Sequence, residues 1–380
     1  MLDDCTQGKA PGSRYATHSY DEIKRRNAVR NLAETREGKL VLESWPRFVM
    51  VELTQGCNLR CSMCRSRQIS YRERAMDRSI LAHVAEFLFP TAELVDIRGW
   101  GESLIAPDVL GIIALVDAYG ARCRVVTNLS FSRADVLDAL VEQGTMIDVS
   151  LDAATQSALD VCRTGARFDI IDGNLRRLVA ALETKGVIEH LRIIATLQRT
   201  TLDELATLVR YIGELGIKQI VLNEVTLRQG DPNAVTGREA EVDRAVAAAV
   251  QAAGITGIEL YAGTALGTCA GLKKNTAFCI HPWSYATIGF DGSVGFCDHL
   301  IGPMMPVSCM GDITATGFEE IWNGPAWQEL RRWHASPNRI DSASFGACSK
   351  CYKHRNVDFE DMFEPLLTRY RLSVMEQGNT

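Results

Sequence analysis

Short β-branched segments alternate with amphipathic segments along the first 225 residues of this chain, and this alternation strongly restricts the fold. The expected strands are 48–53, 94–98, 124–127, 147–151, 191–197 and 219–223. The expected helices are 78–89, 107–119, 133–143, 170–185 and 202–215, and several end at a glycine, which is a common helix terminator. Strands alternating with helices of this length imply βαβ crossovers and a parallel sheet. The sequence therefore predicts an α/β fold, a partial (β/α)6 barrel with active residues at the C-terminal ends of its strands.

The chain is expected to divide into three parts. Residues 1–45 are polar and basic-rich, which favours one or two helices lying on the main domain. Residues 46–235 would form the barrel, and residues 236–380 a small C-terminal unit with a β-hairpin and helices. The hairpin is predicted because Phe290-Asp291-Gly292 is a turn signal between two apolar runs. The segment 317–334 is expected to be helical, with Trp322, Trp327 and Trp333 serving in packing.

Composition and charge exclude several classes of protein. Apolar stretches are far too short to cross a bilayer, and the N-terminal Met-Leu-Asp-Asp-Cys is acidic where a signal peptide is basic. The net charge of −6 is spread over interspersed acids and bases, so neither nucleic acid nor an anionic membrane is an expected partner. We expect a soluble cytoplasmic protein.

Twelve cysteines in a chain without an export signal are not expected to form a disulfide framework, because cytosolic thiols are kept reduced. Seven of them have the spacing of metal ligands: Cys57, Cys61, Cys64, Cys279, Cys297, Cys348 and Cys351. The first three directly follow the first strand as C-x3-C-x2-C. Three thiolates on one loop can bind three corners of a cubic iron–sulfur cluster and leave the fourth iron open. A closed zinc site would need a fourth ligand, and the next histidine, His83, is nineteen residues beyond Cys64 inside an expected helix.

This loop, in this position after the first strand, resembles the signature of the radical S-adenosylmethionine (radical SAM) superfamily. Arg98-Gly99-Trp100-Gly101-Glu102, at the end of the second strand, is similar to the Gly-Gly-Glu motif of that family, with a tryptophan between the two glycines. The resemblance implies that Gly99, Gly101 and Glu102 bind the amino group of the methionine moiety.

The same resemblance implies further contacts to S-adenosylmethionine. Met63 would meet the adenine through its backbone, Asn128 and Ser150 lie at strand ends near the ribose and carboxylate positions, and Asp152 joins them. Arg163 could hold the methionine carboxylate. Ordinary surface or capping roles remain an equal alternative for Ser150, Asp152 and Arg163. The implied chemistry is reductive cleavage of S-adenosylmethionine to a 5′-deoxyadenosyl radical that abstracts a substrate hydrogen.

The C-terminal cysteines form a second set. Cys279 and Cys297 are separated by seventeen residues, and Cys348 and Cys351 form a C-x2-C pair. Four thiolates suit either zinc or a fully ligated iron–sulfur cluster, and the spacing alone leaves both open. The Cys-x-x-Pro-Trp and Asp-Gly-x-Val-x-x-Cys elements resemble the twitch or SPASM extension of radical SAM enzymes. That resemblance implies one auxiliary [4Fe–4S] cluster.

Two reactions are compatible with these two centres. If the auxiliary cluster accepts an electron, an alcohol is oxidised to a carbonyl, which makes the enzyme a dehydrogenase. If a thiol returns a hydrogen to the opposite face, the enzyme is an epimerase. Cys309 is then the best donor, with Cys269 behind it, and a buried inert thiol is the alternative interpretation of Cys309. Glu224, at the end of the sixth strand, would face the barrel mouth, and Asp298, His299 and His281 are further candidate bases.

The favoured substrate is a carbohydrate-like small molecule (a sugar, aminocyclitol or nucleotide sugar) from a natural-product pathway, by analogy with similar enzymes. A peptide-modifying enzyme is the alternative, although 45 residues are too few for the leader-binding domain that such enzymes often carry. A zinc-binding scaffold is a third possibility. A flavodoxin or ferredoxin is expected to donate electrons.

Overall fold

The computed structural model describes residues 19–64, 74–225, 227, 230–262, 279–298, 309–336, 345 and 348, together with the backbone of the short strand 371–372. Cys351, Cys269 and His299 lie outside these described residues.

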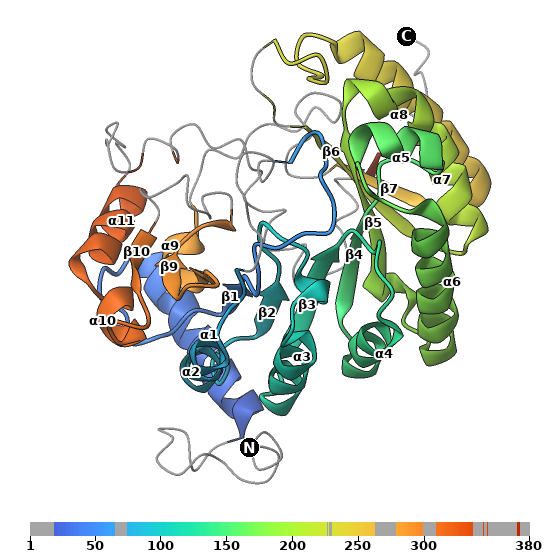
Figure 1. Ribbon diagram of the computed structural model, residues 1–380. Coiled ribbons are helices and arrows are strands. Elements are labelled where there is room, and N and C mark those ends of the chain that lie inside the picture. Colours follow the sequence, from blue (N-terminus) through green and yellow to red (C-terminus); the bar gives the residue numbers. More distant parts are fainter. Residues whose placement is uncertain are drawn as a thin grey trace.

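One large sheet organises the structure (Figure 1). Its strands are β1 (Phe48–Val51), β2 (Leu94–Ile97), β3 (Arg122–Thr127), β4 (Met146–Ser150), β5 (Leu191–Leu197), β6 (Gln219–Glu224), β7 (Glu259–Ala262), β8 (Tyr285–Ile288), β9 (Ser293–Gly295), β10 (Cys309–Asp312) and β11 (Arg371–Leu372). Their order is β10-β9-β8-β1-β2-β3-β4-β5-β6-β7-β11, and β1 to β7 pair in parallel. The predicted α/β class and its six sequential parallel strands are confirmed.

The β8–β9 hairpin belongs to the same sheet. Strand β8 pairs in parallel with β1, with Tyr285 opposite Phe48 and Ile288 opposite Val51. All four residues of β8 are buried, so this strand needs neighbours on both sides, and β1 and β9 supply them. Strand β7 likewise extends the sheet beyond β6. The division of the chain at residue 235 stays a prediction, and the hydrogen-bonded sheet itself continues across it.

The described helices connect the strands and cover one face of the sheet. They are α1 (Tyr20–Glu37), α2 (Arg78–Leu88), α3 (Val109–Ala118), α4 (Ala134–Gln143), α5 (Gln156–Cys162), α6 (Phe168–Lys185), α7 (Leu205–Glu214), α8 (Glu239–Thr256), α9 (His281–Ser284), α10 (Phe318–Trp322) and α11 (Pro325–Ala335). The helix expected over 317–334 is broken in two, because Pro325 lacks an N–H and begins α11 as its first residue. No helix among the described residues is long and apolar enough to span a membrane.

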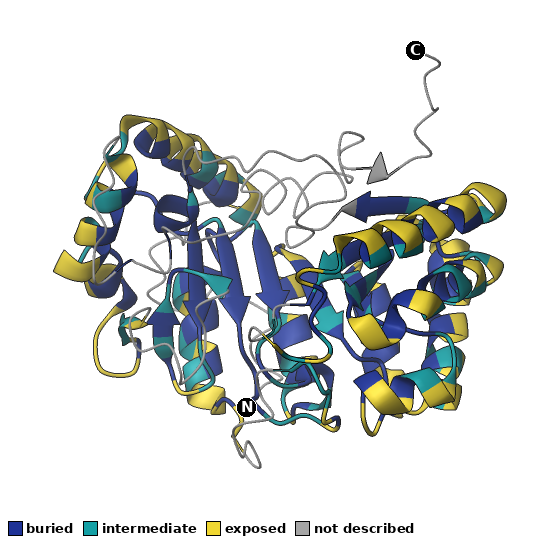
Figure 2. Cartoon of the chain, turned by 90° about the horizontal axis from the view of Figure 1, so that it is seen from above, coloured by how far each residue is buried: buried dark blue, intermediate teal, exposed yellow. Residues whose placement is uncertain are grey.

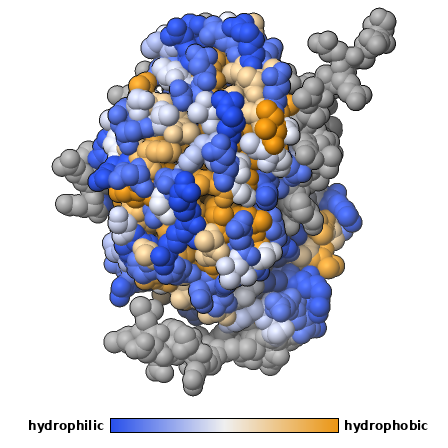
Figure 3. Space-filling model, turned by 90° about the vertical axis from the view of Figure 1, so that its right-hand side faces the viewer, coloured by the Kyte–Doolittle hydropathy of each residue, from blue (hydrophilic) through white to orange (hydrophobic). Residues whose placement is uncertain are grey.

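The two faces of the sheet differ in polarity. On the outer face, the apolar side chains of the strands, such as Val49, Val51 and Val95, pack with the helices in one large apolar core. Figure 2 shows these buried strands enclosed by helices whose outer sides are exposed, and Figure 3 shows mixed polar and apolar surface on the side of α7 and α8. Charged residues of β2 to β5 point instead to the inner face, where Asp148 forms ion pairs with Arg124 and Arg192. The inner wall is therefore polar along β3 to β5 although it is buried, whereas Phe48, Met50, Leu94 and Tyr285 form a small apolar cluster on β1, β2 and β8.

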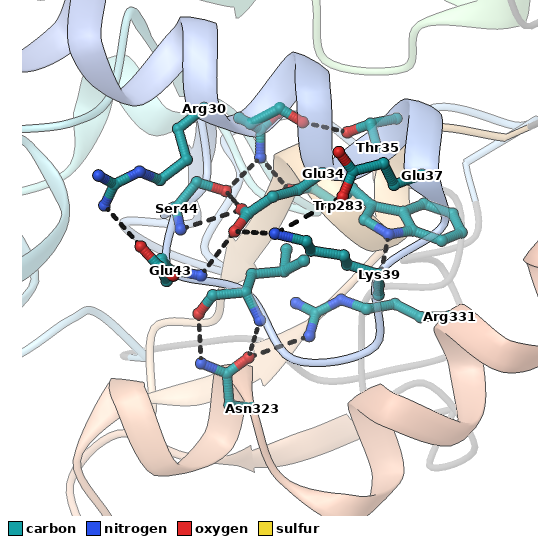
Figure 4. Close-up of polar contacts among 12 residues, drawn as sticks. Arg30, Glu34, Thr35, Glu37, Lys39, Glu43, Ser44, Trp283, Asn323 and Arg331 are labelled. Atoms are coloured by element: carbon teal, nitrogen blue, oxygen red, sulfur yellow. Dashed lines mark hydrogen bonds and ion pairs between the residues drawn. The ribbon is translucent and has the colours of Figure 1, made fainter.

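The segment around α1 fastens the C-terminal helices to the barrel (Figure 4). Glu34 is buried and accepts hydrogen bonds from the backbone N–H groups of Glu43 and Ser44. The Trp283 indole donates to the Lys39 carbonyl at 2.8 Å.

Arg331 is fully buried, donates to the Leu40 carbonyl, and lies 4.4 Å from the Trp322 ring. Burial lowers the pKa of Arg331 to about 9. The packing role predicted for Trp322 and Trp327 is confirmed, since both are buried here.

Asn323→Ala is expected to lower the free energy of unfolding by about 2–3 kcal/mol, because it leaves the N–H and the carbonyl of Leu42 without their hydrogen-bond partner. The Asn323 side chain bonds both the N–H and the carbonyl of Leu42 at 2.8 Å, and it also accepts from Arg331. Asn323→Asp keeps the acceptor and should cost less. Urea unfolding compares the two variants, and equal losses would contradict this assignment.

Candidate active site

The three clustered cysteines lie on the loop that follows β1, and a neighbouring element clamps this loop. The Arg60 N–H donates to the Thr164 carbonyl at 2.8 Å, and the Ser62 N–H donates to the Cys162 carbonyl at 2.9 Å. Both acceptors belong to the end of α5 and the turn after it, which also holds the left-handed Gly165. The loop is thus fixed at two points between its cysteines.

Cys57, Cys61 and Cys64 are half-buried free thiols. The pKa of Cys57 is raised to about 11, chiefly by burial and to a smaller extent by the nearby negative charges of Glu102, Cys61 and Cys64, while the Leu59 N–H lowers it. Burial also raises the pKa of Cys61, while the charge of Arg163 lowers it. The negative charges of three neighbouring, half-buried thiolates repel one another. The deprotonated forms are therefore stable only when a cationic metal is bound. Among the described residues they do not form a ligand group with all donor atoms within 4.8 Å, so their spacing suits separate corners of a cluster better than one zinc ion.

The glycines at the end of β2 permit the backbone to approach this loop closely. A Cβ on Gly101 would lie 2.4 Å from the Gly56 carbonyl oxygen and 2.5 Å from that of Thr54, and one on Gly99 would lie 2.4 Å from the Glu52 side chain. The Glu102 N–H donates to the Gly56 carbonyl at 2.8 Å. The Gly-Trp-Gly-Glu segment therefore packs directly against the base of the cysteine loop.

Glu102 joins β2 to β3 at the same edge. Its buried carboxylate accepts from the Thr127 hydroxyl at 2.8 Å, the Asn128 N–H at 2.7 Å and the Leu104 N–H at 3.3 Å. Burial raises its pKa. Asn128 in turn donates from its amide to Asn58 at 3.0 Å and lies 3.8 Å from the Cys57 sulfur. The structure brings Glu102 and Asn128 to the cysteine loop, and their contact with a ligand stays a prediction.

Asp152 and Arg163 form a buried bidentate ion pair, with N–O distances of 2.9 and 3.1 Å. Asp152 also accepts from the Thr196 N–H at 2.8 Å. Arg163 is thus held by Asp152, and the contact of either residue with S-adenosylmethionine stays a prediction. Ser150 is half-buried at the end of β4.

Met63 packs at the edge of the core, and its sulfur lies 3.9 Å from the Gln198 amide nitrogen. Gln198 is fully buried, and its side-chain oxygen Oε1 has no hydrogen-bond partner among the described residues. A glutamine at a strand end carries no sequence signal that distinguishes it from an ordinary polar residue, so this neighbour of Met63 was not foreseen.

Glu52 is a further buried carboxylate, and the sequence did not indicate it. It accepts from the Trp100 N–H at 2.8 Å and from the Gln55 amide at 3.2 Å, and burial raises its pKa. Its own N–H donates to the Ile288 carbonyl of β8. Glu52 therefore connects the first strand, the glycine segment and the C-terminal hairpin.

Three of the four predicted C-terminal ligands, Cys279, Cys297 and Cys348, are described, and Cys351 is not. Cys297 lies two residues after the end of β9, and donor atoms of His281, Cys297 and Asp298 lie within 4.8 Å of one another. His281 is buried and stacks on Tyr285 at 4.5 Å. These non-cysteine donors next to Cys297 show that the surroundings of the second centre are polar on this side.

The two predicted catalytic residues lie at different places in the sheet. Cys309 is exposed at the start of the edge strand β10, and its thiol contacts the Gly311 carbonyl at 3.4 Å. Glu224 ends β6 opposite Leu197, and strand alternation puts it on the face of Leu222 in the apolar core. Asn223, opposite Thr196, shares the inner face. The roles of Cys309 and Glu224 remain predictions.

A cavity of about 470 Å³ lies between the segment 199–206 and α8. Its lining includes Arg199, Asp203, Glu241 and Arg244, and none of the predicted site residues.

Comparison with known proteins agrees with this arrangement. Residues 51–190 match the model of the radical SAM superfamily, and residues 279–352 match the SPASM iron–sulfur cluster-binding domain. The chain is 25% identical over 316 residues to the AdoMet-dependent heme synthase of Methanosarcina barkeri, an alignment that covers 77% of this chain and 86% of the relative.

Solved structures share the fold. Streptococcus suis SuiB bound to S-adenosylmethionine superposes with a TM-score of 0.61 at 14% identity, covering 91% of this chain and 82% of SuiB. Native anSMEcpe with bound AdoMet gives a TM-score of 0.58 at 15% identity, covering 76% and 84% of the two chains. A radical SAM domain implies S-adenosylmethionine and a [4Fe–4S] cluster, and a SPASM domain implies auxiliary iron–sulfur clusters, so both cofactor predictions are confirmed. The chain is a radical SAM enzyme that carries a C-terminal SPASM domain.

Proposed function

We propose that this radical SAM enzyme oxidises an alcohol carbon of a polar, carbohydrate-like small molecule to a carbonyl. The observation that carries the proposal is the polar inner wall beside the cysteine loop. Ser150, Thr196 and Asn223 share this face near the C-terminal ends of β4 to β6, above the ion pairs of Asp148. Hydroxyl and amide groups of this kind bind the hydroxyl groups of a polar substrate.

The first cluster would be held by Cys57, Cys61 and Cys64. S-adenosylmethionine would be surrounded by the Gly99–Glu102 edge and by Met63, Asn128, Ser150, Asp152 and Arg163. When bound, these cofactors supply a 5′-deoxyadenosyl radical. The clamped loop and the tightly packed glycine segment fix the position at which this radical meets the inner wall. The buried surroundings exclude water from it.

Oxidation requires a second electron acceptor. The substrate carbon loses one hydrogen atom, and the remaining radical then loses one electron and its hydroxyl proton to give the carbonyl. Cys279, Cys297, Cys348 and Cys351 would hold the auxiliary cluster that takes this electron. A flavodoxin or ferredoxin would supply the electron that starts each cycle, and the reducing cytoplasm would protect the thiols.

Epimerisation with Cys309 as hydrogen donor is the less favoured alternative. Strand β10 is separated from β1 by β9 and β8. Because neighbouring strands lie about 4.8 Å apart, β10 and β1 are about 14 Å apart. Modification of a peptide is a third proposal, and its support is the fold that this chain shares with SuiB, which has been solved bound to precursor peptide SuiA.

The test is a reaction of anaerobically reconstituted enzyme with dithionite, S-adenosylmethionine and a panel of sugars and aminocyclitols in deuterated water. We expect 5′-deoxyadenosine and a carbonyl product in equal amounts, both unchanged by Cys309→Ala. Solvent deuterium in an inverted product, lost in Cys309→Ala, would establish epimerisation instead. A mass change confined to a co-expressed peptide would favour the peptide alternative.

A further inference from the structure

Arg98 lies between two carboxylates from distant parts of the chain. Its Nε is 2.8 Å from Asp96, and its Nη2 is 3.1 Å from Asp298, two hundred residues later in the sequence. Asp96 is buried on the inner face, and the side chain of Asp298 is only 10% exposed. The guanidinium is therefore held on both sides by opposite charge.

The position of Arg98 in the chain gives this pair its significance. It immediately precedes Gly99, the start of the segment that packs on the first cysteine loop. Asp298 immediately follows Cys297, and its Oδ1 is 3.9 Å from the Cys297 sulfur while its Oδ2 faces Arg98. One ion pair thus connects the edge of the first cofactor site to a ligand of the second.

The charge of Arg98 acts on the second centre in a definite direction. Reduction of a cluster adds negative charge, and a nearby cation stabilises the reduced form and raises the reduction potential. The carboxylate of Asp298 acts in the opposite direction. Because Arg98 is held in place by Asp96 as well, its charge stays there even without Asp298.

We propose that Arg98 is a positioning residue that orients the Cys297–Asp298 segment and raises the reduction potential of the auxiliary cluster, so that this cluster can accept an electron. The inference rests on the proposed function, in which Cys297 is a ligand of that cluster. It gives the ion pair a role in electron transfer, distinct from any role in binding S-adenosylmethionine.

The experiment measures the midpoint potentials of both clusters in the anaerobic holoenzyme by redox titration followed with electron paramagnetic resonance. Arg98→Gln is expected to lower the potential of the auxiliary cluster, and Asp298→Asn is expected to raise it. The double variant should return close to wild type, and Arg98→Lys, which keeps the charge, should stay nearer to wild type than Arg98→Gln. The potential of the first cluster is the internal reference and should move less.

A purely structural ion pair would give a different result. Shifts of the same sign in Arg98→Gln and Asp298→Asn, or no shift, would overturn the inference. These outcomes are distinct from failure of the proposed function. In that case the wild-type enzyme would contain both clusters and cleave S-adenosylmethionine but form no carbonyl product from the alcohols tested.

Discussion

Gly101→Ala is expected to remove most of the iron from the first cluster site and to reduce 5′-deoxyadenosine formation at least about 100-fold. The added Cβ would lie 2.4 and 2.5 Å from the carbonyl oxygens of Gly56 and Thr54, far inside van der Waals contact. These are backbone atoms directly before Cys57, so they can give way only by displacing the cysteine loop. Iron analysis and chromatography of the reaction products measure both effects.

Gly173→Ala is the matched control for this substitution. Gly173 lies within α6, and a Cβ added there would meet nothing within 4 Å outside the backbone of its own helix. Alanine at this position is therefore expected to stabilise the protein by about 0.5–1 kcal/mol. Full iron content and activity in Gly101→Ala would show that the loop does not depend on this close approach.

Asp148→Asn is expected to destabilise the protein by about 3–5 kcal/mol, because it removes the buried carboxylate charge that two buried arginines share. Asp148 is fully buried and accepts from the Nε atoms of Arg124 and Arg192, both at 2.7 Å. The comparison is Asp138→Asn, which breaks an exposed ion pair with Arg177 and should cost less than about 1 kcal/mol. Chemical unfolding of both variants measures the difference, and similar small losses would contradict the importance of the buried pair.

The effect of Asp148→Asn is also expected to depend on pH. The guanidinium groups of Arg124 and Arg192 hold the pKa of this carboxyl well below its usual range. A carboxyl with a lowered folded pKa contributes stability above its unfolded pKa of about 3.9, and this contribution is lost as the pH falls toward the folded value. The difference in stability between wild type and Asp148→Asn should therefore shrink below about pH 4.

The strands and the first cluster loop could be predicted from the sequence because their signals are local. Alternating strands and helices, and three cysteines spaced within eight residues, need no knowledge of distant segments. The pairing of β8 with β1 could not be predicted in this way, because periodicity shows that Tyr285–Ile288 is buried but does not identify its neighbour. The same is true of Arg98 and Asp298.

Some features were within reach of the sequence and were missed. Glu224 has the same parity as Ile220 and Leu222, so counting along the strand would have placed it on their face, and Asn223 on the inner one. Glu52 and Gln198 were beyond reach, because a single polar residue at a strand end is common and only the fold shows that these two are buried.

The parallel pairing of β1 with β8 has a consequence for synthesis of the protein on the ribosome. Strand β1 ends at Val51, but its second neighbour begins only at Tyr285, so one edge of the first strand stays open while more than two hundred further residues are made. An open apolar edge invites association with other chains. Nascent protein is therefore expected to need chaperone protection until the hairpin emerges.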